Sequence, residues 1–369
     1  MAYAIVLLPG DGIGPEVVVE AKRVLERVVL LSGGEVDLEF EAFEAGAGTW
    51  RRTGEAMSDD TFAACSTADA MLLGAFGLPD VRHPDGREAG SDAMFRLRFD
   101  LDLYAGIRPI KLYAGSPTPL ADVRTGIDYV IVRENVEGVY AGRHGGSRVV
   151  GEVAADTSIV TRAGTERIVR QAFEQAARRS GAPADGVSRV ACVDKANVLA
   201  SYAFFRAIAS EVAASYSDIA FETLYVDAAA LHLVRSPSSF DVIVAENMFG
   251  DILSDLGAAT VGGLGVAPSA DVGERHGVFQ ATHGSAPDIA GTGIANPLAT
   301  ILSAGMMLDW LGRRSADDAS LRAARWVEAA VAEAMRSGRG STPDLGGTAG
   351  TTACCDAVLA ALDAIAAAT

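Results

Sequence analysis

Short apolar, β-rich runs alternate with amphipathic helical patterns along the chain. Runs such as AIVLL (residues 4–8), DYVIVRE (128–134) and FDVIVAEN (240–247) predict strands. Segments such as TERIVRQAFEQAARR (165–179) and SYAFFRAIASEVAASY (201–216) predict helices between them. This alternation predicts an α/β fold, in which ligand sites gather at the carboxyl ends of strands. In this chain the predicted strands end in Arg133-Glu134, Asp194-Lys195, Asp227 and Glu246-Asn247.

The first predicted strand runs into a glycine-rich turn, LLPGDGIGPEV, and a helical pattern follows from about Pro15. A strand, a glycine turn and a helix in this order are typical of dinucleotide-binding folds. The spacing differs, because Gly10, Gly12 and Gly14 give G-x-G-x-G and Pro15 stands where the third glycine should fall. A tight turn with Pro15 opening the helix is the alternative interpretation. Residues elsewhere must therefore decide whether a nucleotide binds.

The composition narrows the class of protein. A chain of 369 residues predicts two domains, and 49% hydrophobic with 21% charged residues is typical of a globular protein. The net charge of −17 and the lack of a Lys/Arg block argue against a nucleic-acid partner. Cys65, Cys192, Cys354 and Cys355 lack the spacing of a metal site or a disulfide framework. With no signal-peptide or membrane-spanning pattern, we expect a cytoplasmic protein.

Two carboxylates lie four residues apart in ENMFGDILSDL, which has a helical pattern. Asp251 and Asp255 therefore share one face of the predicted helix, amid apolar residues. One interpretation is a solvated acidic stripe. The other is a site for a divalent metal ion with hard oxygen ligands, which Asp227, at the end of the predicted strand FETLYVD, would complete.

Arginines lie near the ends of two predicted strands. Arg96, Arg98 and Arg108 lie in RLRFDLDLYAGIRP, and Arg133 lies in DYVIVRE. Guanidinium groups suit bidentate binding of carboxylates, so in an acidic protein these residues indicate a substrate with more than one carboxylate. Each of them alone would equally fit a surface ion pair.

Two further side chains suit proton transfer. Lys195 follows the predicted strand RVACVD, and burial beside a metal ion would lower its pKa enough for a general base. Tyr140, in NVEGVY, would serve as a general acid, because an unperturbed tyrosine keeps its proton at neutral pH. Either residue alone would equally fit a structural role.

Turn-forming residues gather in THGSAPDIAGTGIANP (282–297), which predicts a long ordered loop. Its backbone N–H groups suit phosphate binding. Asp288 would accept hydrogen bonds from a ribose and repel a 2′-phosphate, which favours NAD over NADP. The alternative is a purely structural loop. A second glycine-rich segment, AGRHGGSRVVGEVAADTSIV (141–160), predicts a hairpin or arm for contacts between subunits.

Together these segments resemble the β-decarboxylating dehydrogenases, which include isocitrate, 3-isopropylmalate, homoisocitrate, tartrate and D-malate dehydrogenases. The resemblance spans nearly the whole chain, from LLPGDGIGPEV through DLYAGIRP, VRENVEGVY, VDKANVL, YVDAAA, ENMFGDILSD and HGSAPDIAGTGIANP to TPDLGG. It implies a two-domain, non-Rossmann fold of the isopropylmalate dehydrogenase type, with a mixed sheet flanked by helices. Residues 1–103 and 262–369 would form the cofactor-side domain. Residues 104–261 would form the substrate, metal and dimerisation domain, with an arm near 140–160.

The resemblance also implies the reaction. Such enzymes oxidise a 3-substituted malate with NAD and Mg²⁺ or Mn²⁺, and the β-keto acid then loses CO₂. Asp227, Asp251 and Asp255 would bind the metal, Lys195 and Asp227 would take the hydroxyl proton, and Tyr140 would protonate the carbon. The implied substrate-binding residues are Met94, Phe95, Arg98, Arg108, Arg133, Asn197 and Val198. The implied cofactor-binding residues are Ile13, His283, Gly284, Ser285, Ala286, Asp288, Ile289 and Asn296.

Members of this family form dimers in which the residues matching Lys195 and Asp227 reach the neighbour's site. We therefore expect a homodimer with shared active sites, with a tetramer as the alternative, and a small dicarboxylate or tricarboxylate substrate. No nucleic-acid or membrane partner is expected. A non-catalytic regulatory subunit is the alternative class of function, but Tyr140, Lys195 and the three aspartates favour an enzyme.

The substituent on C3 of the substrate is read, by resemblance, by residues just before Arg98. Met94, Phe95 and Val198 form an apolar trio that favours 3-isopropylmalate, giving 2-oxoisocaproate, and an unpaired carboxylate against Phe95 would be costly. The alternatives are isocitrate, homoisocitrate, tartrate, D-malate or another 3-substituted malate of a specialised pathway. VRENVEGVYAG resembles the isocitrate and homoisocitrate branches, and Arg96 is placed to read a charged substituent.

Overall fold

The computed structural model describes residues 2–144, 146–149 and 152–368. The chain divides into two compact units that alternate along the sequence. Unit 1 comprises Met1–Asp102, Tyr113–Pro117 and Gly262–Thr369, and unit 2 comprises Leu103–Leu112 and Thr118–Val261. The roles predicted for the two domains stay predictions.

Unit 1 is built on five strands in the order β2-β1-β3-β12-β11. β1 is parallel to β2 and β3, β12 is parallel to β3, and β11 is antiparallel to β12. The central strand β3 is buried along its whole length, which explains its unbroken apolar sequence AMLLGA. The strands are β1 (Tyr3–Gly10), β2 (Leu38–Ala42), β3 (Ala70–Ala75), β11 (Pro268–Val272) and β12 (Gly277–Ala281).

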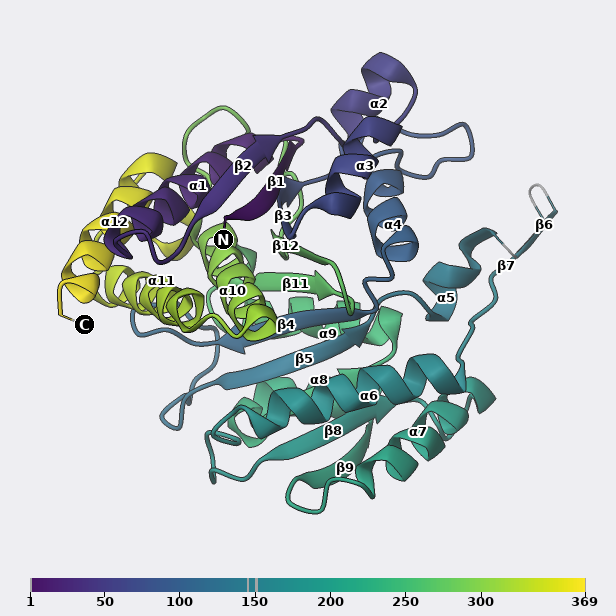
Figure 1. The fold of residues 1–369 in the computed structure, drawn as a ribbon. Helices are drawn as coiled ribbons and strands as arrows, with labels where there is room; N and C mark the ends of the chain where they lie inside the picture. The colour runs from purple at the N-terminus through teal and green to yellow at the C-terminus, as the bar shows by residue number, and fades with distance from the viewer. Residues whose placement is uncertain (1, 145, 150–151, 369) are drawn as a thin grey trace. The chain divides into compact units, whose positions relative to one another are not determined.

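Seven α-helices belong to unit 1 within the described residues: α1 (Gly14–Leu31), α2 (Ala47–Thr53), α3 (Asp59–Thr67), α4 (Ser91–Asp100), α10 (Leu298–Ser315), α11 (Asp318–Ser337) and α12 (Thr351–Ala366). α10 packs against β3, β11 and β12, and α11 and α12 follow it around the unit (Figure 1). As the turn chemistry predicts, α1 begins beside Pro15, and its apolar side buries Val17, Val24 and Val28. Short 3₁₀ turns lie at Leu264–Val266 and Pro343–Leu345.

Unit 2 carries five strands in the order β4-β5-β10-β8-β9. β4 is antiparallel to β5, and the other neighbours are parallel. The strands are β4 (Ala105–Lys111), β5 (Asp128–Glu134), β8 (Arg189–Asp194), β9 (Ala220–Tyr225) and β10 (Val242–Ala245). Because β5, β8 and β10 are parallel, their carboxyl ends lie at one edge, and the predicted polar residues gather there. Each unit therefore confirms the expected α/β architecture, with a mixed sheet flanked by helices.

Helices cover both faces of the strands of unit 2. α6 and α7 pack on one face, and α8 and α9 lie behind the strands in the view of Figure 1. The helices are α5 (Gly138–Ala141), α6 (Arg162–Ala177), α7 (Ala200–Ala213), α8 (Val226–Arg235) and α9 (Asn247–Ala259), with 3₁₀ turns at Gly142–His144 and Pro237–Ser239. α9 packs against β4, β5 and β10, which places its polar side near the ends of these strands.

The predicted hairpin at 141–160 forms two antiparallel strands, β6 (Ser147–Val149) and β7 (Val153–Ala155). Its base is closed by a bridge between Gly138 and Ile159, and β7 is exposed (Figure 1). Residues 145, 150 and 151 of this predicted arm lie outside the described residues. Through the described part of the chain, no helix combines the length and apolar character needed to cross a membrane. All four cysteines are buried free thiols, and Cys354 and Cys355 lie inside α12.

Candidate active site

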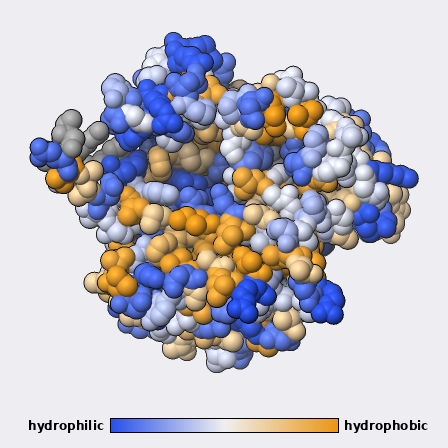
Figure 2. Space-filling view, turned by 180° about the vertical axis from the view of Figure 1, so that it is seen from behind, coloured by the Kyte–Doolittle hydropathy of each residue, from blue (hydrophilic) through white to orange (hydrophobic). Residues whose placement is uncertain are grey.

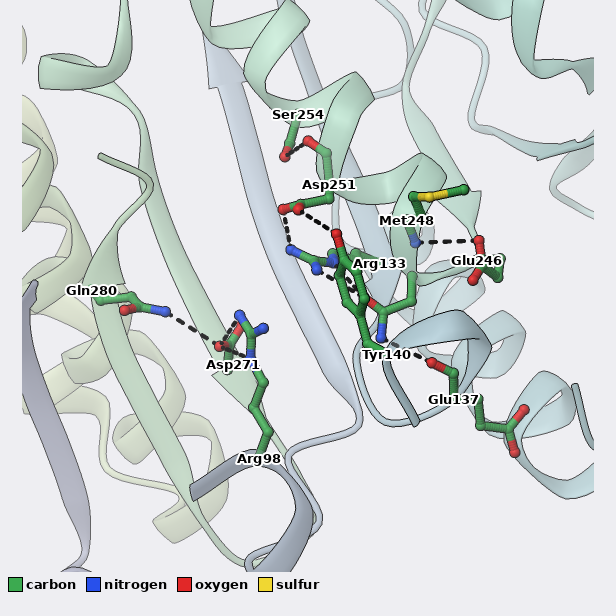
Figure 3. A network of polar contacts seen from close by, with 11 residues as sticks. Arg98, Arg133, Glu137, Tyr140, Glu246, Met248, Asp251, Ser254, Asp271 and Gln280 are labelled. Carbon is green, nitrogen blue, oxygen red and sulfur yellow. Dashed lines mark hydrogen bonds and ion pairs between the residues drawn. The ribbon is translucent and has the colours of Figure 1, made fainter. Parts of the chain in front are cut away.

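Arg133 is the centre of a polar network at the end of β5. The side chain is almost fully buried, and its Nε and Nη2 donate to Asn247 Oδ1 on α9 over 3.1 and 2.7 Å. Its Nη1 forms an ion pair with Asp251, one turn further along the same helix (Figure 3). Asn247 Nδ2 in turn donates to Glu137 O over 3.0 Å. The network thus fixes the guanidinium between a neutral amide and a carboxylate that reaches solvent.

Tyr140, on the short helix α5, joins this network. Its hydroxyl donates to Asp251 Oδ2 over 3.3 Å, and the Arg133 guanidinium lies 5.6 Å from the centre of its ring (Figure 3). Burial, followed by the negative charge of Asp251, raises the pKa of Tyr140 above its usual value of 10.0. Tyr140 therefore holds its proton at neutral pH, as a general acid requires.

The two aspartates of α9 share one face of the helix, as their spacing predicts. Asp251 is bound by Arg133 and Tyr140, whereas the carboxylate of Asp255 makes no hydrogen bond or ion pair with any described residue. The surrounding protein raises the pKa of Asp255, and the nearby charge of Asp251 raises it further. The charges of Arg108 and Arg133 act in the opposite direction, so two carboxylates and two guanidinium groups lie near one another here.

Arg108 lies on β4, next to the strand that carries Arg133. It is 5% exposed, and its Nε is buried with no hydrogen-bond partner within the described chain. Its charge lowers the pKa of Asp255, so the two side chains influence each other across this part of unit 2. A buried guanidinium nitrogen without a partner is unusual, because desolvation is normally balanced by a hydrogen bond. Arg108 is therefore suited to an anionic ligand.

Lys195 and Asp227 form an ion pair with each other in unit 2. Lys195 follows β8, as predicted, but the prediction that Asp227 ends a strand is wrong. β9 ends at Tyr225, and Asp227 lies in the first turn of α8, where a carboxylate is favoured by the helix dipole. The ammonium group of Lys195 lowers the pKa of Asp227. No hydrogen bond or ion pair joins this pair to Asp251 among the described residues.

The turn that carries Lys195 is held by a buried carboxylate that sequence reasoning did not single out for this task. Asp194 accepts from Ala196 N over 2.8 Å and binds Arg206 through both oxygens at 2.7 and 2.8 Å. Arg206 also lies over the ring of Tyr225, the last residue of β9. The signal in the sequence is an aspartate that ends an apolar strand directly before a candidate base.

Arg98 is held within unit 1 by a residue that sequence reasoning missed. Its Nε and Nη2 bind Asp271 Oδ2 on β11 at 2.9 and 2.8 Å, and Gln280 Nε2 donates to the same oxygen over 3.3 Å (Figure 3). Asp271 is fully buried. Two of the three guanidinium nitrogens of Arg98 are thus used by an internal partner. An aspartate in the otherwise apolar run around β11 was the available signal.

The other predicted substrate residues lie on α4 and after β8. Met94 and Phe95 are partly buried on α4, while Asn197 and Val198 are exposed. Arg96 donates to Asp59 Oδ1 over 2.6 Å and to Met57 O over 3.2 Å. In this structure Arg96 is therefore engaged within unit 1.

The predicted loop 282–297 has no helix or strand and contacts the glycine-rich turn of α1. Ile13 N donates to Ser285 O over 2.8 Å, and Ala286 and Ile289 pack against Ile13. Gly284 and Asp288 are exposed. The amide of Asn296 donates to Asp344 Oδ2 over 2.9 Å.

His283, near the start of this loop, is partly buried, and its Nδ1 lies 2.9 Å from Gly284 O. Its Nε2 has no hydrogen-bond partner within the described chain, and burial lowers its pKa. The lowered pKa favours a neutral ring at neutral pH, whose free Nε2 is able to accept a hydrogen bond from a ligand.

The structure thus brings together Arg133, Tyr140 and Asp251 by direct contacts, with Asp255 and Arg108 nearby. It pairs Lys195 with Asp227 separately. In the portion of the chain that the structure describes, no three His, Cys, Asp or Glu side chains form a metal-binding group. The three predicted metal ligands are therefore not assembled by one copy of the chain alone.

Comparisons with known proteins show the family of this chain. Residues 4–360 match the family model described as isocitrate/isopropylmalate dehydrogenase. A 3-isopropylmalate/3-methylmalate dehydrogenase of Methanocaldococcus jannaschii is 43% identical over 95% of this chain and 96% of its own length. A 3-isopropylmalate dehydrogenase of Archaeoglobus fulgidus is 41% identical over 97% of this chain and 99% of its own.

A solved structure shares the fold as well. The isocitrate dehydrogenase from Methylococcus capsulatus is 37% identical and superposes with a TM-score of 0.84, covering 98% of this chain and 99% of that chain. The matches therefore extend over both units.

Proposed function

This chain belongs to the isocitrate/isopropylmalate dehydrogenase family and is a β-decarboxylating dehydrogenase, and we propose that it converts 3-isopropylmalate to 2-oxoisocaproate with NAD and Mg²⁺ or Mn²⁺. The observation that carries this proposal is the unpartnered, buried Nε of Arg108 beside the strand that holds the Arg133–Asp251–Tyr140 network. Arg108 and Arg133 bind the substrate's carboxylates, and Arg98 stays a predicted third ligand.

A divalent cation fits the donor set of α9. Asp251 and Asp255 supply hard oxygen ligands four residues apart on one face of the helix, and the carboxylate of Asp255 has no hydrogen-bond or ion-pair partner among the described residues. Asp227 is the third ligand, supplied by a partner copy, since it lies on α8 with its side chain 67% exposed. When bound, the metal ion polarises the C2 oxygen and stabilises negative charge on it.

Side chains of this protein accept and donate the protons of the reaction. As a base Lys195 acts as the neutral amine: once its ammonium group has released a proton to solvent, it accepts the proton of the C2 hydroxyl, beside Asp227, as the C2 hydride leaves for NAD. The C3 carboxylate then departs as CO₂, and its bonding electrons pass to C3. Tyr140, whose raised pKa keeps it protonated, donates the proton that completes C3.

NAD fits the 282–297 loop on two observations. The buried Nε2 of His283 lacks a partner, and the exposed carboxylate of Asp288 is available to the adenosine ribose. An acid at Asp288 repels a 2′-phosphate and so favours NAD over NADP.

The working form of the enzyme is a homodimer with shared sites. Unit 2 exposes Val198, Leu231, Val234 and Ile252 on or near α8 and α9, between 44% and 67%. Apolar side chains also gather on the lower part of the molecule in Figure 2, the view from the side of these helices. Such a patch is typical of a protein–protein interface. Lys195 and Asp227 would enter the neighbour's site beside it.

Complementation tests the shared site. Lys195→Ala and Tyr140→Phe subunits are each expected to be inactive alone. Mixed dimers contain one site with an intact Tyr140 from one subunit and an intact Lys195 from the other, so activity returns on mixing. No recovery in dimers verified by mass spectrometry would mean that each site uses one chain.

Substrate choice is tested by NADH formation with Mn²⁺ on a panel. The panel contains 3-isopropylmalate, 3-methylmalate, isocitrate, homoisocitrate, D-malate and tartrate, with NADP as the alternative cofactor. We expect 3-isopropylmalate to have the highest kcat/KM, because Met94 and Phe95 offer an alkyl substituent apolar contacts. A preference for isocitrate or homoisocitrate would overturn this assignment and require Arg96 to leave Asp59.

A further inference from the structure

The segment LLPGDGIGPEV contacts the backbone of the 282–297 loop at two points. At the first, Ile13 N donates to Ser285 O over 2.8 Å, and a Cβ at Gly12 would lie 1.9 Å from the same oxygen. Only glycine therefore allows this close approach. At the second, the carboxylate of Glu16, in the first turn of α1, accepts from Gly291 N. The two contacts bracket the segment that carries Asp288.

Apolar contacts fill the space between these two points. Ile13 and Val17 are one helical turn apart and form a buried cluster with Ala295. Ala286 and Ile289 of the loop pack against that cluster. The loop is therefore seated on the start of α1 by side chains as well as by its backbone.

Asp11, in the glycine-rich turn, supports the same loop indirectly, through the backbone of Gly77. The side chain is buried and accepts from Ala47 N and Gly48 N over 2.7 Å each and from Gly77 N over 2.8 Å. Gly77 O then accepts from the hydroxyl of Ser285. Asp11 thus fixes the backbone position to which the loop is tied.

The loop needs such support, because its backbone is strained. Ala286 has a φ of +37°, in a region that residues other than glycine rarely adopt. Such a conformation persists only where the surroundings hold it. The contacts at Ser285 and Gly291 lie on either side of Ala286.

We infer that Glu16 is a positioning residue for dinucleotide binding, which acts by holding the 282–297 loop through Gly291. The inference rests on the proposed function, in which this loop binds NAD. The glycine motif then serves the nucleotide indirectly. Its glycines and acids shape the loop, while the loop residues contact the cofactor.

The test compares Glu16→Ala, Glu16→Gln and Glu26→Ala. Glu26 lies on the same helix and forms an ion pair with Lys22, so Glu26→Ala is the matched control. We expect Glu16→Ala to raise the KM for NAD about tenfold, the order for losing one hydrogen bond to a charged acceptor, with kcat at saturating NAD unchanged. Glu16→Gln retains an acceptor and should restore most of the affinity.

Hydrogen exchange gives a readout that needs no activity. Amides of residues 286–293 should exchange faster in Glu16→Ala than in the parent or in Glu26→Ala, with equal Tm. Equal exchange and equal KM for NAD in Glu16→Ala and Glu26→Ala would overturn the inference. If the unaltered protein binds no NAD in a fluorescence titration, the proposed function fails, and loop exchange still decides whether Glu16 holds the loop.

Discussion

Two buried arginines in Figure 3 are held in different ways. In unit 1, Arg98 binds Asp271, whose side chain is 0% exposed. In unit 2, Arg133 binds Asp251, whose side chain is 39% exposed and also accepts from Tyr140. Both arginines are almost buried, so the difference lies in the carboxylate. One carboxylate is sealed inside the protein, and the other reaches solvent.

The difference bears on what each ion pair contributes to stability. Removing one member of a sealed pair leaves a buried charge without a partner, which costs folding free energy. A carboxylate at the surface can exchange an arginine or tyrosine partner for a ligand. Arg108 extends the comparison, since its buried Nε has no partner among the residues described. The three arginines thus differ in their partners: Arg98 has a buried carboxylate, Arg133 has a carboxylate that reaches solvent, and the Nε of Arg108 has none among the described residues.

The largest effect, on kcat, is expected for Tyr140→Phe, in the Arg133–Asp251–Tyr140 network. Removing the hydroxyl takes away the proton donor and should lower kcat by about 10²- to 10⁴-fold, the usual contribution of a general acid. Because the ring is kept and the 3.3 Å hydrogen bond to Asp251 is a long one, Tm should hardly change. Steady-state kinetics and thermal denaturation measure both, with Tyr216→Phe as the control. Full activity of Tyr140→Phe would exclude Tyr140 as the donor.

The buried Arg98–Asp271 ion pair should instead affect the stability of the fold. Asp271→Asn leaves Arg98 buried without a charged partner and should lower the free energy of unfolding by about 3–5 kcal/mol. Asp59→Asn is the control, because Asp59 is an exposed partner of Arg96 and surface pairs contribute only about 0–1 kcal/mol. Chemical denaturation of the two variants compares them. Equal stability would mean that burial does not distinguish the two pairs.

A smaller effect, on the pH dependence of stability, is expected from Glu134, which ends β5 beside Arg133. Burial raises its pKa from 4.5 to about 8, although the backbone N–H groups of Val136 and Glu137 donate to it. Between these two values the folded protein binds more protons than the unfolded chain, so stability falls as the pH rises through this window.

Glu134→Gln removes that titration while keeping an acceptor for the two N–H groups. The variant should match the parent near pH 5 and exceed it at pH 9 by about 2–4 kcal/mol. Denaturation at both pH values measures the difference. A parent protein whose stability rises from pH 5 to pH 9 relative to the variant would contradict the assigned shift.

The strands were the most predictable part of the fold. β3 and β10 are buried along their whole length, so their sequences read as unbroken apolar runs, and β5 has such a run between Asp128 and Arg133. The boundary at Asp227 was not predictable in this way. The apolar pattern of FETLYVD continues through Val226, where the backbone already turns into α8.

The candidate site was only partly predictable. The i,i+4 spacing placed Asp251 and Asp255 on one face of α9, because that relation is local. The partner of Arg98 is not local, since Asp271 lies 173 residues away and meets it only through the packing of α4 and β11. No periodicity encodes such a pairing. The roles proposed for these residues stay predictions.

The most direct test of this account is the binding of 3-isopropylmalate to Arg108→Gln, measured by calorimetry with Mn²⁺ present. Lys111→Gln, on the same strand, is the matched control. Arg108→Gln is expected to weaken binding about 10- to 100-fold, the contribution of hydrogen bonds to a charged group, with an unchanged Tm. Unchanged binding together with a lower Tm would show that Arg108 stabilises the fold and does not bind the substrate.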